Sequence, residues 1–189
     1  SEEKGDVAAP AETAGDTADE PQAMVIPEED APLVLDFITE ANEHIETAES
    51  ALLEIENEPD NSELVNKVFR SFHTIKGMAG FLNLTEIGSL AHSSENLLDL
   101  ARKGQLVLAG DISDVVFESV DMLKAMLAGL QDSLEAGRPV PCQTGLPSML
   151  EALKDASEGR TPAPSLNTAK ARENDKKLDE IVEDKAEAK

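Results

Sequence analysis

Apolar side chains recur every three or four positions over four long stretches of the chain, which is the spacing of amphipathic helices. The predicted helices span about 32–57, 62 to 80–83, 85–103 and 111–136. Because the loops between them are short, the predicted fold class is all-α, an antiparallel up-and-down four-helix bundle. A shorter apolar stretch at 147–156 predicts a fifth helix that packs on the end of the bundle.

The first helix has the clearest predicted core stripe. Its members are apolar and three or four residues apart: Leu33, Phe37, Ile38, Ala41, Ile45, Ala48, Leu52 and Ile55. Turn and capping residues separate the helices. Ser62 or Asn61 should cap the second helix and Thr85 the third, while Gly137 should end the fourth.

The two ends of the chain have a different composition from the middle. Residues 1–31 hold ten acidic residues against Lys4 and are predicted to be a disordered acidic tail or linker. The bundle should occupy 32–137, the fifth helix lies in the segment 138–157, and 158–189 should be a charged linker, disordered or transiently helical. The chain begins with Ser rather than Met, so it could be an excised fragment.

Composition excludes several classes of function. The net charge of −23 argues against binding to nucleic acid or to an anionic membrane surface. A chain with five Phe and neither Trp nor Tyr favours an aliphatic helical core. No apolar stretch approaches the ~18 residues of a membrane span, so no membrane insertion is expected. The single cysteine, Cys142, excludes an internal disulfide and fits a cytoplasmic protein.

The second predicted helix carries an unusual histidine. At about 100° per residue, the apolar face of this helix lies away from His73, while Arg70 and Lys76 lie within about 60° of it. Gly77 and Gly80 lie on the same side, although each glycine costs a helix about 1 kcal/mol relative to Ala. These glycines suggest that another protein approaches the imidazole closely. The plain alternative is a solvated surface histidine.

The sequence around His73 resembles the phosphoacceptor motif of histidine phosphotransfer (HPt) domains. The motif is HTIKGMAG at 73–80, extended by VFRSF at 68–72 and FLNL at 81–84. A second match, LAHSSENLLD at 90–99, is followed by Arg-Lys-Gly at 102–104. Together these segments look most like the N-terminal phosphoacceptor domain of CheA-type chemotaxis kinases, and the similarity covers about 33–135.

The resemblance implies roles for three residues. His73 would be the phosphoacceptor, and Glu95 would hydrogen-bond its Nδ1 and leave Nε2 free for phosphorylation. On the third helix Glu95 lies on the flank of the apolar face, from which it can reach a neighbouring helix. His92 would belong to the same polar cluster as a supporting residue. A solvated surface glutamate is the alternative for Glu95.

Further roles concern charge and docking. The resemblance implies that Lys76 offsets the phosphoryl charge. Arg70, Gly77 and Gly80 are predicted to face a docking partner. A zinc site formed by His73, His92 and Glu95 is conceivable, but the spacing matches no standard site and no cysteine is near, so no metal is predicted.

No glycine-rich phosphate loop follows a strand in this chain, so we expect it to carry a phosphoryl group rather than to bind ATP. The resemblance implies that a CheA-type kinase domain, which holds ATP and Mg²⁺, loads His73. A CheY- or CheB-like response regulator would receive the phosphoryl group. The chain itself would need no cofactor, and whether it is part of an enzyme is open, although the parent protein is expected to be a histidine kinase.

Two alternatives remain from the sequence. One is a free-standing HPt carrier that is loaded from a receiver domain, and the other is a non-catalytic acidic helical interaction module. A kinase domain encoded beyond Lys189 would exclude the first. Acid-labile, base-stable phosphate on His73 would exclude the second.

Overall fold

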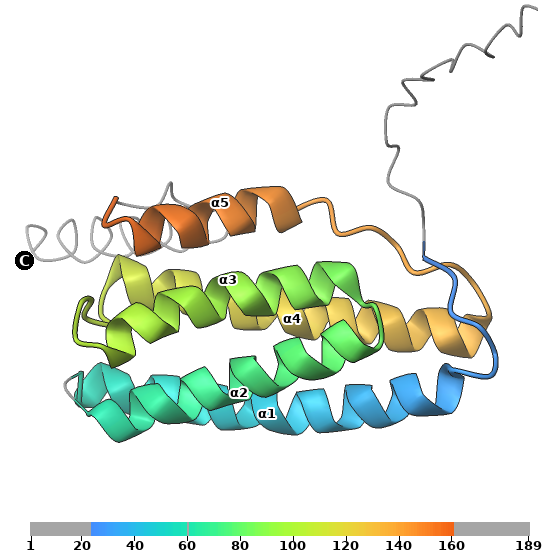
Figure 1. Ribbon diagram of the computed structural model, residues 1–189, viewed down its shortest axis with the longest axis horizontal. Helices are drawn as coiled ribbons and strands as arrows, with labels where there is room; N and C mark the ends of the chain where they lie inside the picture. The colour runs from blue at the N-terminus through green and yellow to red at the C-terminus, as the bar shows by residue number, and fades with distance from the viewer. Residues whose placement is uncertain (1–23, 60, 161–189) are drawn as a thin grey trace, which may run out of the picture.

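The computed structural model describes residues 24–59 and 61–160, and in these residues the protein is all-α (Figure 1). The helices are α1 (Ala31–Asn57), α2 (Ser62–Phe81), α3 (Thr85–Arg102), α4 (Asp111–Ala136) and α5 (Leu146–Ser157). The predicted fold class is therefore confirmed. The predicted disorder of 1–23 and 161–189 concerns segments outside the described residues.

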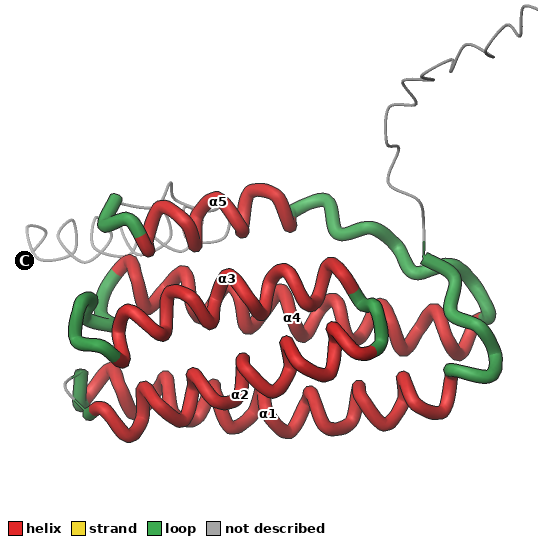
Figure 2. Tube along the Cα trace, viewed as in Figure 1, coloured by secondary structure: helices red, strands yellow, loops and turns green. Residues whose placement is uncertain are grey.

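The first four helices run alternately in opposite directions along one long axis (Figure 2). α1 packs beside α2 and α4, and α3 packs beside α2 and α4, so the four helices enclose a common core. The loops that join them are short, and each helix can therefore pack against the one before it in the sequence.

Local signals in the sequence set the ends of the helices. The Asn61 side chain accepts hydrogen bonds from the amides of Glu63 and Leu64 and so caps α2. Gly137 ends α4 in the left-handed conformation, with φ of 59°, where a residue without Cβ is favoured. Thr85, the predicted cap of the third helix, instead lies inside α3. Its hydroxyl donates to the carbonyl of Asn83 and caps no amide of the helix.

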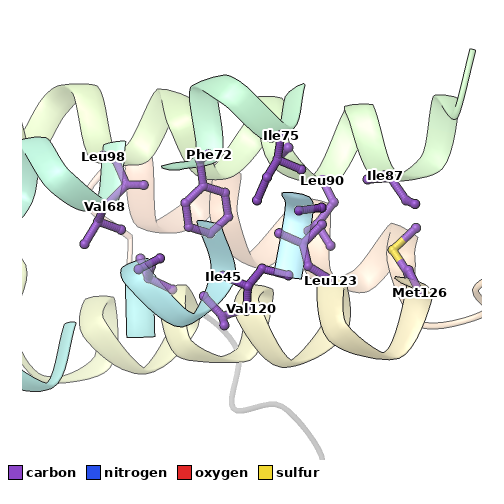
Figure 3. Packing of buried hydrophobic residues seen from close by; sticks show 14 of the residues in the cluster. Ile45, Val68, Phe72, Ile75, Ile87, Leu90, Leu98, Val120, Leu123 and Met126 are labelled. Atoms are coloured by element: carbon purple, nitrogen blue, oxygen red, sulfur yellow. The ribbon is translucent and has the colours of Figure 1, made fainter. Parts of the chain in front are cut away.

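The core is built mainly from aliphatic side chains, with the buried rings of Phe37 and Phe72 among them. Figure 3 shows Phe72 of α2 among apolar residues from all four bundle helices, including Ile45, Leu90 and Leu123. Phe72 is 1% exposed, and Leu90 and Leu123 are fully buried. Burial of each such side chain contributes about 1.5–3 kcal/mol, so the position of α2 is well determined.

The predicted stripe of α1 is wrong at its first member. Leu33 is 46% exposed, whereas the neighbouring Val34 is 3% exposed. The buried positions of α1 include 34, 38, 41, 45, 48, 52 and 55, which alternate steps of four and three. Leu33 is one position out of phase with this repeat and therefore points to solvent.

The fifth helix also departs from its predicted position. It lies along the side of the bundle against α3 and α4 rather than on its end (Figure 1). Its buried residues Leu146, Met149, Leu153 and Ala156 join the main core.

The segment before α1 was predicted to belong to the disordered tail, but its last residues are ordered. Val140 donates a backbone hydrogen bond of 2.8 Å to the carbonyl of Met24, and the Met24 and Ile26 side chains pack against the core. Met24 and Ile26 thus bury part of their apolar surface, whereas Val25 between them is 69% exposed. Among the described residues, no helix is both long and apolar enough to cross a membrane.

Candidate functional site

His73 lies near the middle of α2 with its side chain on the outside of the bundle. The side chain is 61% exposed, while its neighbour Phe72 and the nearby Ile75 are each 1% exposed. The amphipathic pattern thus places the imidazole opposite the core, as predicted. The burial of Phe72 and Ile75 holds the backbone that carries it.

Glu95 reaches this imidazole from α3. Its Oε1 lies 2.9 Å from His73 Nδ1, and the carboxylate is largely buried, with 12% of the side chain exposed. An ionised carboxylate only accepts hydrogen bonds, so we assign the proton to Nδ1. The lone pair of the neutral ring then belongs to Nε2, for which the described residues provide no hydrogen-bond partner.

Lys76 completes the cluster from the next turn of α2. Its Nζ lies 2.6 Å from Glu95 Oε2. The contact is an ion pair between the ammonium group and the carboxylate. Burial acts to raise the pKa of Glu95, but the contacts with His73 and Lys76 outweigh it and hold the pKa below its ordinary value. Glu95 is therefore ionised at neutral pH and is not a solvated surface residue.

An aromatic ring that the sequence reasoning assigned no role also contacts His73. The Phe69 and His73 rings are stacked, with centroids 5.9 Å apart and an angle of 18° between their planes. Arg102, at the end of α3, places its Cζ 4.3 Å from the centroid of the Phe69 ring. The spacing of four residues between Phe69 and His73 was the available signal, since side chains at i and i+4 of a helix are neighbours.

His92 lies apart from this cluster. It is exposed on α3, and its described polar contact is with Asn96, whose Nδ2 lies 3.4 Å from His92 Nε2. The structure thus brings His73, Lys76 and Glu95 together, while no polar contact among the described residues joins His92 to any of them. The described residues contain no group of three or more His, Cys, Asp or Glu that could hold a metal ion.

The surface around His73 is open on the side of the predicted docking residues. A Cβ added to Gly77 or Gly80 would meet no heavy atom within 4 Å, so packing within the bundle does not require glycine at either position. Arg70 is exposed and lines a groove of about 760 Å³ between α1 and α2. Lys67 lines the same groove, and neither cation has an ion pair with a described residue.

Comparisons with known proteins agree with this geometry. A model of the Hpt domain family matches residues 32–156. The sensor histidine kinase CheAY of Helicobacter pylori is 42% identical over 98 residues, which are 52% of this chain and 12% of that protein. The chemotaxis protein CheA of Halobacterium salinarum is 36% identical over 123 residues, 65% of this chain and 18% of that protein. The chain therefore spans less than a fifth of the length of these relatives.

Solved structures of single domains match over almost their whole length. The CheA phosphotransferase domain of Thermotoga maritima is 35% identical, with a TM-score of 0.52, and the match covers 53% of this chain and 96% of that one. The phosphorylated P1 domain of CheA3 from R. sphaeroides, solved in complex with CheY6, is 25% identical with a TM-score of 0.59. That match covers 70% of this chain and 98% of that one. With its exposed histidine, buried glutamate and helical bundle, this chain belongs to the Hpt domain family.

Proposed function

We propose that this protein carries a phosphoryl group on His73 Nε2 and passes it from an ATP-dependent CheA-type kinase domain to an aspartate of a response regulator. One observation carries the proposal. The hydrogen bond from His73 Nδ1 to Glu95 holds the neutral imidazole in the tautomer whose Nε2 is nucleophilic, on an exposed face of a rigid helix.

Loading of the imidazole is an in-line displacement. Nε2 attacks the γ-phosphorus of ATP, the N–P bond forms, and the bond from phosphorus to the β,γ-bridging oxygen breaks, so that ADP leaves. The ring keeps its proton on Nδ1 and becomes cationic. The ionised Glu95 stabilises this cation through the existing 2.9 Å contact.

In the transfer step the imidazole is the leaving group and the receiver aspartate is the nucleophile. A carboxylate oxygen of the receiver aspartate attacks the phosphorus, the N–P bond breaks, and its electron pair returns to Nε2. Lys76, already paired with Glu95, places a positive charge beside the site and offsets part of the charge of the phosphoryl oxygens. The solved complex of the phosphorylated R. sphaeroides P1 domain with CheY6 supports a response regulator as the acceptor.

The proposed docking surface is the face of α2 that carries His73. Arg70 supplies positive charge, and Gly77 and Gly80 leave room for a partner's backbone close to His73. In a chain with a net charge of −23, Lys67 and Arg70, which have no ion pair with a described residue, suit an acidic receiver surface or the phosphates of a kinase-bound nucleotide. We further propose that the kinase domain holds ATP and Mg²⁺ and that the present chain needs no cofactor of its own. We also propose that the chain acts in the cytoplasm.

The test is incubation of the protein with a CheA-type kinase core that lacks its own phosphotransfer domain, together with ATP and Mg²⁺. Acid-labile, base-stable phosphate on His73 is expected, followed by its loss on addition of a CheY-like receiver. Labelling from a phosphorylated receiver but not from kinase and ATP would support the free-standing carrier instead. Absence of labelling from both donors would contradict a phosphotransfer function.

A further inference from the structure

Phe69 and Arg102 form a contact chain that leads from the end of α3 to the imidazole of His73. We propose that they are positioning residues for phosphoryl transfer, because the Phe69 ring fixes the plane of the imidazole and Arg102 fixes the Phe69 ring. This inference rests on the proposed function of His73 and assigns roles to residues outside the His73–Glu95–Lys76 cluster.

The first step is that the hydrogen bond to Glu95 restrains the imidazole at one edge only. It holds a single atom, Nδ1, and the torsion that turns a histidine ring about its Cβ–Cγ bond has a broad energy minimum. Tilting of the ring about its contact with Glu95 moves Nε2, which lies on the other side of the ring. The core cannot restrict this motion, because 61% of the side chain is exposed.

The second step is that Phe69 supplies the missing constraint. Its ring lies within 18° of parallel to the imidazole, at a centroid distance within the 4.5–7 Å range of favourable aromatic pairs. A hydrogen bond at one edge and a stacked ring on one face together define the direction of the Nε2 lone pair. Phe69 is itself partly buried and packs against the core, so it is a fixed surface for this contact.

The third step concerns Arg102, which lies over the Phe69 ring. The guanidinium is 4.3 Å from the ring centroid, and Asp99 holds it with a contact of 2.6 Å between Oδ1 and Nη2. Asp99 also pairs with Lys103 at 2.5 Å. These contacts lower the pKa of Asp99, first through Lys103 and then through Arg102, so Asp99 is ionised when the site works. The last turn of α3 thus holds the Phe69 ring, which stacks against the His73 imidazole.

Orientation of a nucleophile has a direct effect on rate. An error of about 1 Å in the placement of a reacting group can cost about 100-fold in rate. Loss of the stacked ring leaves the Glu95 contact in place, so a smaller effect is expected. Phosphoryl loading of Phe69→Leu should be about tenfold slower in kcat, with KM for the kinase core within about twofold of wild type.

The experiment compares Phe69→Leu, Phe69→Tyr and Arg102→Gln with Phe117→Leu. Phe117 of α4 is also partly buried against the core, and its ring has no described contact with a histidine, so it controls for loss of apolar volume. Phe69→Tyr keeps the ring and should restore the rate. Arg102→Gln should also slow phosphoryl loading, by a smaller factor than Phe69→Leu does. Phe117→Leu should load at the wild-type rate.

A second measurement needs no phosphoryl transfer. NMR relaxation of the labelled His73 ring in the unphosphorylated protein should report greater motion in Phe69→Leu than in wild type, Phe69→Tyr or Phe117→Leu. Unchanged ring motion and unchanged kcat in Phe69→Leu would overturn the proposal. A raised KM with normal kcat would also overturn it and would make Phe69 a docking residue. Absence of His73 labelling in the wild type would contradict the proposed function, whereas the ring-motion result would stand by itself.

Discussion

Glu95 lies 22 residues after His73 in the sequence, yet its Oε1 is 2.9 Å from His73 Nδ1 across the α2–α3 interface. The carboxylate is ionised and largely buried, and its second oxygen pairs with Lys76. This relationship assigns the proton of the exposed imidazole to Nδ1 and leaves Nε2 as the proposed nucleophile.

His73→Gln should abolish phosphorylation and lower the free energy of unfolding by only about 1 kcal/mol, because the side chain lies outside the core and its loss removes one hydrogen bond to Glu95, which keeps its ion pair with Lys76. Phosphate labelling and urea unfolding measure the two effects. His92→Gln is the matched control, since His92 is also exposed and lies on the adjacent helix. Labelling of His73→Gln at the wild-type level would place the phosphorylation site elsewhere.

Glu95→Ala should slow the loading of His73 without preventing it, because the carboxylate orients the ring and stabilises its charge but does not attack phosphorus. Support of this kind is typically worth about 100-fold or more, and the exposure of His73 places this site at the low end of that range. Rapid-quench measurement of single-turnover loading tests the effect. Glu54→Ala, which removes an exposed glutamate of α1, should load normally. Equal rates for the two variants would show that Glu95 has no part in loading.

The stability contributed by Glu95 should depend on pH in a defined direction. Its pKa in the folded protein lies below the ordinary value of 4.5, so the folded state binds fewer protons than the unfolded state between the two pKa values. The contribution is therefore complete above pH 4.5 and is lost as the pH falls through the folded-state pKa.

Urea unfolding of wild type and Glu95→Gln between pH 7 and pH 3 measures this dependence. The difference in unfolding free energy between the two proteins should be larger at pH 7 than at pH 3. The same comparison with Glu54→Gln, where the residue replaced is exposed, corrects for the general effect of losing one carboxylate. A difference for Glu95→Gln that grows as the pH falls would contradict the assigned direction of the pKa shift.

Gly77→Leu should impair phosphoryl transfer more than folding. The new side chain enters open space beside His73, where a partner is proposed to dock, and exchange of glycine for a better helix former stabilises a helix by up to about 1 kcal/mol. Transfer kinetics to a CheY-like receiver and thermal unfolding measure the two effects. Ala128→Leu, at an exposed position of α4, tests whether any added leucine has the same effect.

A stable Gly77→Leu protein with slow transfer and a raised KM for the receiver is the expected outcome. Gly77→Ala should lie between wild type and Gly77→Leu, because its Cβ occupies less of the open space. If Gly77→Leu unfolds while the folded fraction transfers at the normal rate, the glycine serves the helix rather than the partner.

Much of this architecture could be predicted from the local pattern. The 3.6-residue period of a helix determines which side chains share a face, so the exposure of His73 and the burial of Phe72 and Ile75 follow from spacing alone. Capping groups act within a few residues. Asn61 accordingly caps the beginning of α2, and Gly137 ends α4, as predicted. The phosphoacceptor motif is likewise local, since His73, Lys76 and Gly77 lie within two turns of one helix.

Contacts between helices were decided by the tertiary structure. Spacing placed Glu95 on the flank of its helix, but its burial and its 2.9 Å contact depend on how α3 is rotated against α2. The same rotation brings Arg102 onto the Phe69 ring. Helical periodicity defines directions within one helix and carries no information on the distance to the next, which is set by the packing of apolar side chains from several helices at once. For this reason the sequence alone identified His73 as the candidate phosphoacceptor and determined that it lies on an exposed face, and only the folded bundle decided what holds its ring in place.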